Sequence, residues 1–188
     1  LAGFKLLHQI IKKPAVAISD EALEPLLNIV LSASANRWYR VASSALTILL
    51  AFIERFLSVR RDAPAEAKLQ TATYVKKYRL YEALQPLAFG AKKDQVVKDL
   101  ALQCLSSVIA RAGDTLGPEV VVSALTEGAR RLKSDVLRVS VLQALRRIMR
   151  SDLDLGVEND AARLFPDVFA LLRQTDRKVN VLALQLLG

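Results

Sequence analysis

The stretch VKDLALQCLSSVI, at residues 97–109, decides the fold, because two later stretches of the chain repeat it. These are LRVSVLQALRRIM at 137–149 and VNVLALQLLG at 179–188, and both align with the first copy without gaps. The second copy begins 40 residues after the first, and the third begins 42 residues after the second. Apolar residues recur at steps of three and four, which is typical of one helix face. The chain therefore contains a helical unit that repeats about every 40 residues.

A looser copy, YRVASSALTIL at 39–49, precedes these three. It lies 59 residues before the matching positions of the copy at 97–109. This spacing is roughly 20 residues longer than the repeat period. The stretch VRRDAPAEAKLQTAT at 59–73 supplies them. Because this stretch is polar and contains Pro64, we predict an elongated loop there.

Further helical stretches alternate with these copies, and three of them contain a proline that would bend the helix, whereas Thr126 takes the corresponding position between the second and third. They are EALEPLL (21–27), EALQPLA (82–88) and LFPDVFALL (164–172), with Pro25, Pro86 and Pro166. Polar residues that can cap a helix N-terminus stand before each copy. These expected caps are Asn36, Asp94, Ser134 and Asp176. The repeating unit is thus predicted to be a helix, a short turn and a second helix.

Two helices per unit of about 40 residues are typical of HEAT and armadillo repeats. We therefore predict an all-α fold, a HEAT-repeat (ARM-like) right-handed α-solenoid of antiparallel helix pairs. All of 1–188 is expected to form one solenoid fragment. Its expected parts are a leading helix at 1–13 and pairs at about 19–58, 72–112, 117–150 and 158–188.

The first and last residues suggest a piece of a longer protein. The chain starts at Leu1 without Met and in the middle of a pattern, and it stops inside the last copy. We expect the last helix to be incomplete, with Leu184 and Leu187 lacking the partners that a following repeat would supply.

The composition limits the class of protein. Of 188 residues, 52% are apolar and 24% charged, so the chain is expected to be globular. No apolar run reaches the roughly 18–20 residues that a membrane span needs. A single cysteine cannot form an internal disulfide, which suits a cytoplasmic and/or nuclear location. The net charge of +8 favours acidic partners and permits nucleic acid, although a solvated arginine-rich surface explains it as well.

No constellation of residues predicts catalysis or a cofactor. His8 is the one histidine, and both His8 and Cys104 lie among apolar residues, so we expect structural roles for them. Zinc would need three or four such ligands. The acidic stretch at 152–160 departs from a calcium loop, because its glycine is fifth and its twelfth position is Arg163. We therefore predict no enzymatic activity, metal site, cofactor or small-molecule substrate.

A polar column on the second helices is the candidate partner-binding site. Gln103, Gln143 and Gln185 occupy one repeat position, and Ser44 takes it in the looser copy. Ser107 and Arg147 share the position four residues later. We add Arg40, which stands beside the local cluster of Trp38 and Tyr39. The predicted partner-binding residues are Arg40, Ser44, Gln103, Ser107, Gln143, Arg147 and Gln185, and plain solvation remains an equal interpretation.

Several motifs resemble known families. VKDLALQCL at 97–105 and LRVSVLQAL at 137–145 resemble the HEAT consensus, whereas Asn180 departs from it where a basic residue is expected. The run from YVKKYRLYEAL to ARAGDTLG, at 74–117, is similar to the cullin-associated, neddylation-dissociated (TIP) proteins. VRRDAP at 59–64 and the run RLKSDVLRVSVLQAL at 131–145 fit that pattern too.

This resemblance implies a scaffold in the regulation of ubiquitin ligases. Members of that family are long HEAT solenoids that wrap cullin–RING complexes, bind the unmodified cullin and promote exchange of substrate receptors. The chain would be a central stretch of such a solenoid, with a cullin–RING complex as its partner and no membrane. Two alternatives stay open: a nuclear-transport or chromosome-scaffold HEAT protein, and a basic helical repeat that binds nucleic acid.

Overall fold

The structure, a computed structural model, is built from α-helices. It describes residues 2–13, 15, 17–57, 64–90, 93–131, 138–150, 165–173 and 176–187. All regular secondary structure among them is helical. The helices are α1 (Ala2–Lys12), α2 (Asp20–Ser34), α3 (Tyr39–Phe56), α4 (Ala65–Lys77), α5 (Leu80–Phe89), α6 (Gln95–Leu116), α7 (Pro118–Arg131), α8 (Arg138–Met149), α10 (Phe165–Leu171) and α11 (Arg177–Leu187).

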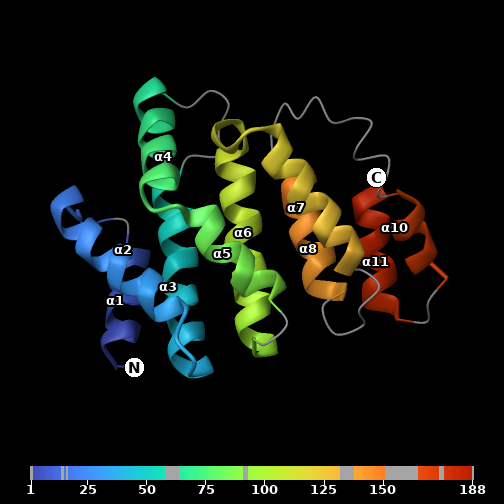
Figure 1. Cartoon of the computed structure of the whole chain (residues 1–188), viewed down its shortest axis with the longest axis horizontal. Helices are drawn as coiled ribbons and strands as arrows, with labels where there is room; N and C mark the ends of the chain where they lie inside the picture. Colours follow the sequence, from blue (N-terminus) through green and yellow to red (C-terminus); the bar gives the residue numbers. More distant parts are fainter. Residues whose placement is uncertain are drawn as a thin grey trace.

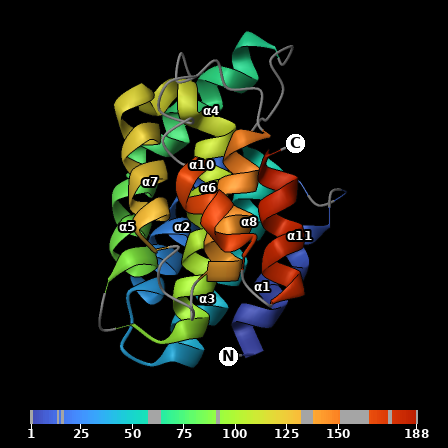
Figure 2. The ribbon, with the colours of Figure 1, turned by 90° about the vertical axis from the view of Figure 1, so that its right-hand side faces the viewer.

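The helices form an elongated stack in two layers. Helices α1, α3, α6, α8 and α11 each contact the next along the stack, and we call this layer the B row. Helices α2, α5, α7 and α10 each pack on a B-row helix and form the A row. Figure 1 shows the termini at opposite ends of the stack. Figure 2 shows α5 and α7 on one side and α8 and α11 on the other. The predicted all-α solenoid is therefore confirmed.

The core is one continuous apolar layer between the two rows. It runs from Ile11 in α1 to Leu186 in α11, so every helix pair completes its core with side chains of its neighbours. In α6 the face expected from the step of three and four is buried, with Ala101 and Cys104 both 0% exposed. Burial of these faces, rather than intrinsic helix propensity, therefore holds the stack together.

The loop predicted at 59–73 is wrong over its second half, because Ala65 begins helix α4. Its sequence AEAKLQTATYVKK consists mainly of good helix formers, with Glu66 in the first turn and two lysines in the last. Pro64 immediately precedes α4, where a proline does not interrupt the helix. The unit expected to begin at residue 72 thus contains three helices, α4, α5 and α6.

Polar side chains begin two of the B-row helices as predicted. The Oδ1 atom of Asp94 accepts a hydrogen bond from the Val96 amide at 2.9 Å, at the start of α6. Asp176 does the same for α11, where it accepts from the amide of Lys178 at 2.8 Å. Each carboxylate thus satisfies a backbone donor that the helix leaves unpaired.

Other expected helix signals lie elsewhere in the structure. Asn36 stands before the capping position of α3, which is Trp38, and Asn36 Oδ1 accepts from the Trp38 amide at 2.9 Å. Pro166 is the second residue of α10 rather than an interior one, whereas Pro25 and Pro86 lie inside α2 and α5. Ser134 and the acidic stretch at 152–160 lie outside the described residues.

Candidate protein-binding groove between α6 and α8

A groove runs between two neighbouring helices of the B row. It is lined by side chains of α6 and α8, namely Gln103, Ser106, Gln143, Ala144, Arg146, Arg147 and Arg150. Three residues of the predicted partner-binding set, Gln103, Gln143 and Arg147, therefore come together here. Small side chains at the helix contact leave the space, because Ser106 and Ala144 face each other across it. We call this feature the α6–α8 groove.

Arg147 connects the two walls of the α6–α8 groove. Its Nη1 atom donates to the Ser107 hydroxyl at 2.6 Å and to the Gln103 carbonyl oxygen at 3.0 Å. The Ser106 hydroxyl lies 3.4 Å from the same nitrogen. A cation on α8 is thus held in place by acceptors on α6, which fixes the guanidinium at the groove wall.

Ser107, a member of the predicted partner-binding set, does not present its hydroxyl to solvent. Ser107 is 0% exposed, because α3 and α8 cover α6 from both sides at this level and the guanidinium of Arg147 lies over the hydroxyl. The residue therefore serves to position Arg147 rather than to contact a partner.

Arginines gather at one end of the α6–α8 groove. The Nε atoms of Arg111 and Arg146 are buried and have no hydrogen-bond partner among the residues that the structure describes, and Arg150 is exposed. Burial lowers the pKa of the Arg111 guanidinium, Glu54 opposes this change and Arg147 adds to it, so Arg111 and Arg147 repel each other. Among the described residues, none of these arginines forms an ion pair.

An acidic residue marks the opposite end of the contact between α6 and α8. The Oδ1 atom of Asp99 accepts from the Ser140 hydroxyl and from the Gln95 amide group, each at 2.8 Å. Because Asp99, Gln103, Ser107 and Arg111 follow one another at steps of four on α6, they share one side of that helix. The polar side of α6 therefore changes from acidic to neutral to basic along its axis.

The other predicted partner-binding residues lie outside the groove. Ser44 donates its hydroxyl to the Arg40 carbonyl at 2.7 Å within α3. Arg40 is exposed, and its Nε atom donates to the Tyr39 hydroxyl at 3.1 Å. Gln185 is exposed on α11. Their helices are members of the B row, but the structure does not bring these side chains into one site with Gln103.

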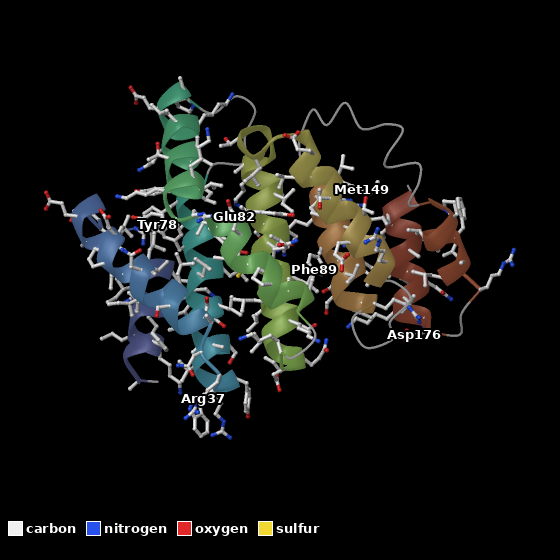
Figure 3. All side chains as sticks on the ribbon, viewed as in Figure 1. Arg37, Tyr78, Glu82, Phe89, Met149 and Asp176 are labelled. Carbon is white, nitrogen blue, oxygen red and sulfur yellow. The ribbon has the colours of Figure 1, made fainter. Side chains whose placement is uncertain are left out.

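An exposed aromatic pair stands at the turn between α2 and α3. Trp38 is 65% and Tyr39 46% exposed, and the guanidinium of Arg37 lies 5.7 Å from the centre of the Trp38 ring. Figure 3 shows Arg37 projecting from this edge of the molecule. The cluster is thus solvated and lies at the end of the helices rather than along the B row.

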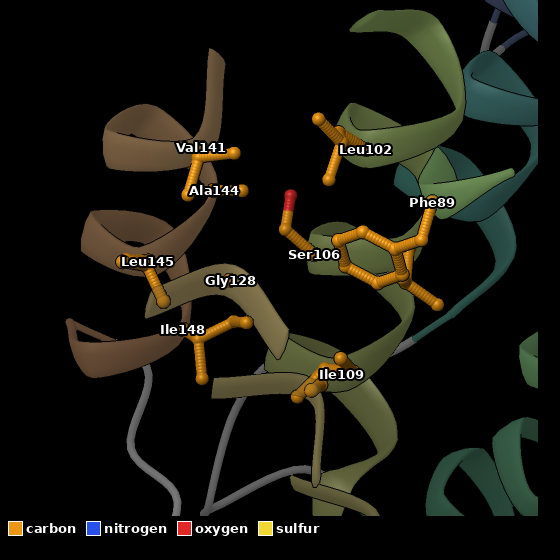
Figure 4. Close-up of a pocket in the computed structure, with 11 residues that line it drawn as sticks. Phe89, Leu102, Ser106, Ile109, Gly128, Val141, Ala144, Leu145 and Ile148 are labelled. Carbon is orange, nitrogen blue, oxygen red and sulfur yellow. The ribbon is translucent and has the colours of Figure 1, made fainter. Parts of the chain in front are cut away.

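An apolar cavity lies beneath the groove, inside the core. Figure 4 shows residues of α5, α6, α7 and α8 around it, including Phe89, Leu102, Gly128 and Leu145. Its volume of about 20 Å³ holds no more than a single water molecule, so it is a packing defect rather than a ligand pocket. Ser106 and Ala144 separate this cavity from the groove above, since both line the two spaces.

The two residues considered for chemistry are placed as the sequence predicted. Cys104 is completely buried, and its thiol donates to the Leu46 carbonyl at 3.4 Å. Burial raises the pKa of Cys104 far above its ordinary value, which keeps the thiol neutral. His8 is half-buried on α1, and burial and then Lys12 lower its pKa. Among the described residues, no group of acidic, histidine or cysteine side chains could hold a metal ion.

Sequence reasoning missed the arginines beside Arg147. Arg146 and Arg150 lie at the C-terminal end of α8, where basic residues are common because they stabilise the helix dipole, and Arg111 lies alone inside α6. A clue was the spacing of Arg146 and Arg150, which lie four residues apart and hence on one side of α8. The pattern of each helix taken alone does not show that Arg111 on α6 lies near Arg147 on α8.

None of the described helices combines the length and the apolar character that crossing a bilayer requires.

Comparisons with known proteins support the resemblance seen in the motifs. No protein-family model matches the chain. It is 26% identical over 163 residues to cullin-associated NEDD8-dissociated protein 1 of Drosophila melanogaster, covering 87% of the chain and 13% of that protein. The protein of the same name from Arabidopsis thaliana is 25% identical over 155 residues, covering 82% of the chain and 12% of that protein. The chain thus spans about an eighth of these relatives.

Solved structures share the fold. Two crystal structures of engineered proteins superpose on almost the whole chain, with TM-scores of 0.66 and 0.63 at 17% and 18% sequence identity. They match 99% and 98% of this chain, and 70% and 42% of the engineered chains. At this identity the likeness concerns the fold alone. The sequence motifs, the stack of helix pairs and the two relatives agree that this chain is similar, over most of its length, to cullin-associated NEDD8-dissociated protein 1.

Proposed function

We propose that this chain is part of a non-enzymatic protein-interaction scaffold that regulates cullin–RING ubiquitin ligases in the cytoplasm or nucleus. The observation that carries the proposal is the similarity over 87% of the chain to a protein named for its association with cullins. The all-α solenoid supports it, because a stack of helix pairs offers a long surface to a protein partner.

The B row is the proposed contact surface. Gln143 and Gln185 are exposed there at the same position of two repeats, and Gln143 also lines the α6–α8 groove. Stable protein interfaces bury about 800 Å² on each partner, which several consecutive repeats provide and a single pair does not. Amide side chains supply hydrogen bonds, while arginines are frequent among the residues that dominate binding energy. Gln103, Arg147, Arg40 and Ser44 belong to the same proposed surface.

Binding to the two forms of a cullin tests this function. The natural protein that contains this chain is immobilised. Retention of an unmodified cullin–RING complex is compared with retention of the same complex after NEDD8 attachment. We expect retention of the unmodified complex and loss of binding to the modified one. The variant Gln143→Ala/Gln185→Ala should weaken retention, whereas the control Gln85→Ala/Thr126→Ala, on the A row, should not.

Two results would contradict the assignment. Equal retention of modified and unmodified complexes would show that the chain does not distinguish the state of the cullin. Absence of cullin binding, together with binding to a Ran-type GTPase that depends on its nucleotide, would favour the nuclear-transport alternative.

A further inference from the structure

Positive charge is concentrated at one end of the α6–α8 groove. Arg146, Arg147 and Arg150 line it, and Arg111 lies close enough to repel Arg147. Among the described residues these four form no ion pair, although three of them are partly buried. Removing a cation from water without pairing it is costly. The arrangement is therefore one that an added anion would stabilise.

The arginines are also held ready for an anion. Arg147 uses its Nη1 atom for all its hydrogen bonds to α6, which leaves Nη2 and Nε without an acceptor among the described residues. Arg150 follows Arg147 by three residues and Arg146 by four, so the three guanidinium groups start from one side of α8. A guanidinium binds a carboxylate with two parallel hydrogen bonds when its geometry is fixed, and less conformational entropy is then lost.

We propose that the arginine end of the α6–α8 groove anchors the carboxylates of a short acidic segment in a partner protein. This inference rests on the proposed protein-binding function of the B row and specifies the chemistry that the row recognises. The neutral amides of Gln103 and Gln143 occupy the middle of the groove and accept polar backbone or side-chain groups of that segment.

Acidic groups at the borders favour a protein segment over a nucleic acid. Asp99 lies at the far end of the same side of α6. Glu54, which belongs to α3, lies near Arg111 of α6. Both would repel a chain of phosphates that continued past the arginines. From Asp99 to Arg111 the helix rises about 18 Å, which corresponds to five or six residues of extended peptide. A segment with its acidic residues at one end matches this distribution of charge.

A peptide titration tests the proposal without any cullin. Fluorescein-labelled hexaglutamate and hexaglutamine are titrated with the chain at about 50 mM and 150 mM salt, and fluorescence anisotropy is measured. We expect hexaglutamate alone to bind. The variant Arg146→Gln/Arg150→Gln should bind it about tenfold more weakly, which is the effect of losing one or two charge-assisted hydrogen bonds.

The matched control has the same net charge. Arg37→Gln/Arg130→Gln removes two exposed arginines, one at the turn before α3 and one on α7, and should change the affinity by no more than about twofold. Arg150→Gln alone changes only an exposed side chain, so a clear loss with that variant cannot come from unfolding. Circular dichroism of each variant checks that the helices persist.

The other outcomes separate the anchor from the cullin assignment. Equal losses in the two double variants would show attraction by overall charge. Tighter binding of hexathymidine than of hexaglutamate, lost in Arg146→Gln/Arg150→Gln, would assign the site to nucleic acid. Failure of cullin retention with intact hexaglutamate binding would contradict the cullin assignment alone. Cullin retention without any preference for hexaglutamate over hexaglutamine would contradict the anchor alone.

Discussion

Arg147 shows how one side chain links two repeats. Its Nη1 atom reaches from α8 to a buried hydroxyl and a backbone carbonyl on α6, at 2.6 Å and 3.0 Å. The Gln103 carbonyl already accepts from the Ser106 hydroxyl at 3.1 Å within α6, so Arg147 adds a further donor to it. Hydrogen bonds that involve a charged group contribute about 1.5–3 kcal/mol each, more than those between neutral groups. The contact thus stabilises the interface and fixes the groove wall together.

Replacing Arg147 with Met should lower the free energy of unfolding by about 1–3 kcal/mol, because Met keeps most of the packing and removes the donors. Urea denaturation measures the change. Arg150→Met, at an exposed position, should change it by less than about 0.5 kcal/mol. In a double-mutant cycle with Ser107→Ala, the combined loss should be smaller than the sum of the two single losses. Strict additivity would show that the hydrogen bond does not stabilise the folded chain.

Cys104 makes the stability depend on pH in the alkaline range. Burial raises the pKa of its thiol in the folded chain, whereas the unfolded thiol titrates near 8.5. Above that pH the unfolded state loses its proton and is stabilised, while the folded thiol stays neutral. The stability is therefore complete below about pH 8 and falls as the pH rises.

Between pH 8 and pH 9.5, the free energy of unfolding should fall by about 1 kcal/mol more in the natural chain than in Cys104→Ala. Urea unfolding curves at four pH values measure this difference. The alanine variant is less stable at every pH, but it lacks the thiol and keeps all the lysines. The difference between the two proteins therefore reports the titration of the thiol alone. Parallel curves for the two proteins would show that the folded thiol ionises normally.

At the scale of the helix, the sequence predicts an element well where its buried face repeats. The B-row helices follow their apolar steps, and Asp94 and Asp176 begin two of them with the expected hydrogen bonds. Helix α4 is an exception, because its polar sequence and Pro64 predict a loop instead. Its helix-forming residues and its end charges were visible in the sequence, but three buried residues in thirteen left no strong apolar period.

The groove was only partly predictable for a related reason. Repeat positions place Gln103 beside Gln143, since neighbouring B-row helices are equivalent copies. They do not show how far a long side chain reaches, so Arg147 covering Ser107 could not be seen. Nor do they show that Arg111 on α6 faces the arginines of α8, because that depends on the angle between the two helices.

Arg79 marks the break between α4 and α5, and its backbone carries a cost. Its φ of 46° and ψ of 49° are left-handed, a conformation that suits glycine and disfavours other residues by about 1 kcal/mol. Its ion pair with Glu82 is 3.8 Å long and exposed, so it contributes little.

Arg79→Gly should therefore raise the free energy of unfolding by about 0.5 kcal/mol, since the relief of strain exceeds the added entropy of the unfolded chain. Lys76→Gly, which removes the same charge inside α4, should lower it by about 1 kcal/mol. Thermal and urea unfolding of the two variants compare them directly. Destabilisation by Arg79→Gly would mean that residue 79 does not adopt the left-handed conformation and that the helix continues from α4 into α5.

For the whole molecule, each helix is stabilised mainly by its immediate neighbours. Helix α8 contacts α6, α7 and α11, whereas α1 and α2 make their main contacts with α3. The core is continuous, but each described helix contacts only elements close to it along the stack. In such an array, stability is close to a sum of repeat and interface contributions, and opening at one end need not reach the other.

Hydrogen exchange measured by mass spectrometry tests this independence. Leu142, which is 0% exposed in α8, is replaced by Ala, and we expect protection to fall by about 2–5 kcal/mol in α8 and α11 and by less in α6. Helices α1, α2 and α3 should keep their protection. The control Leu23→Ala, at a position 2% exposed in α2, should give the reverse pattern. If either variant lowered protection equally in all helices, the chain would unfold as one cooperative unit, and a partner bound at the α6–α8 groove would then stabilise both ends equally.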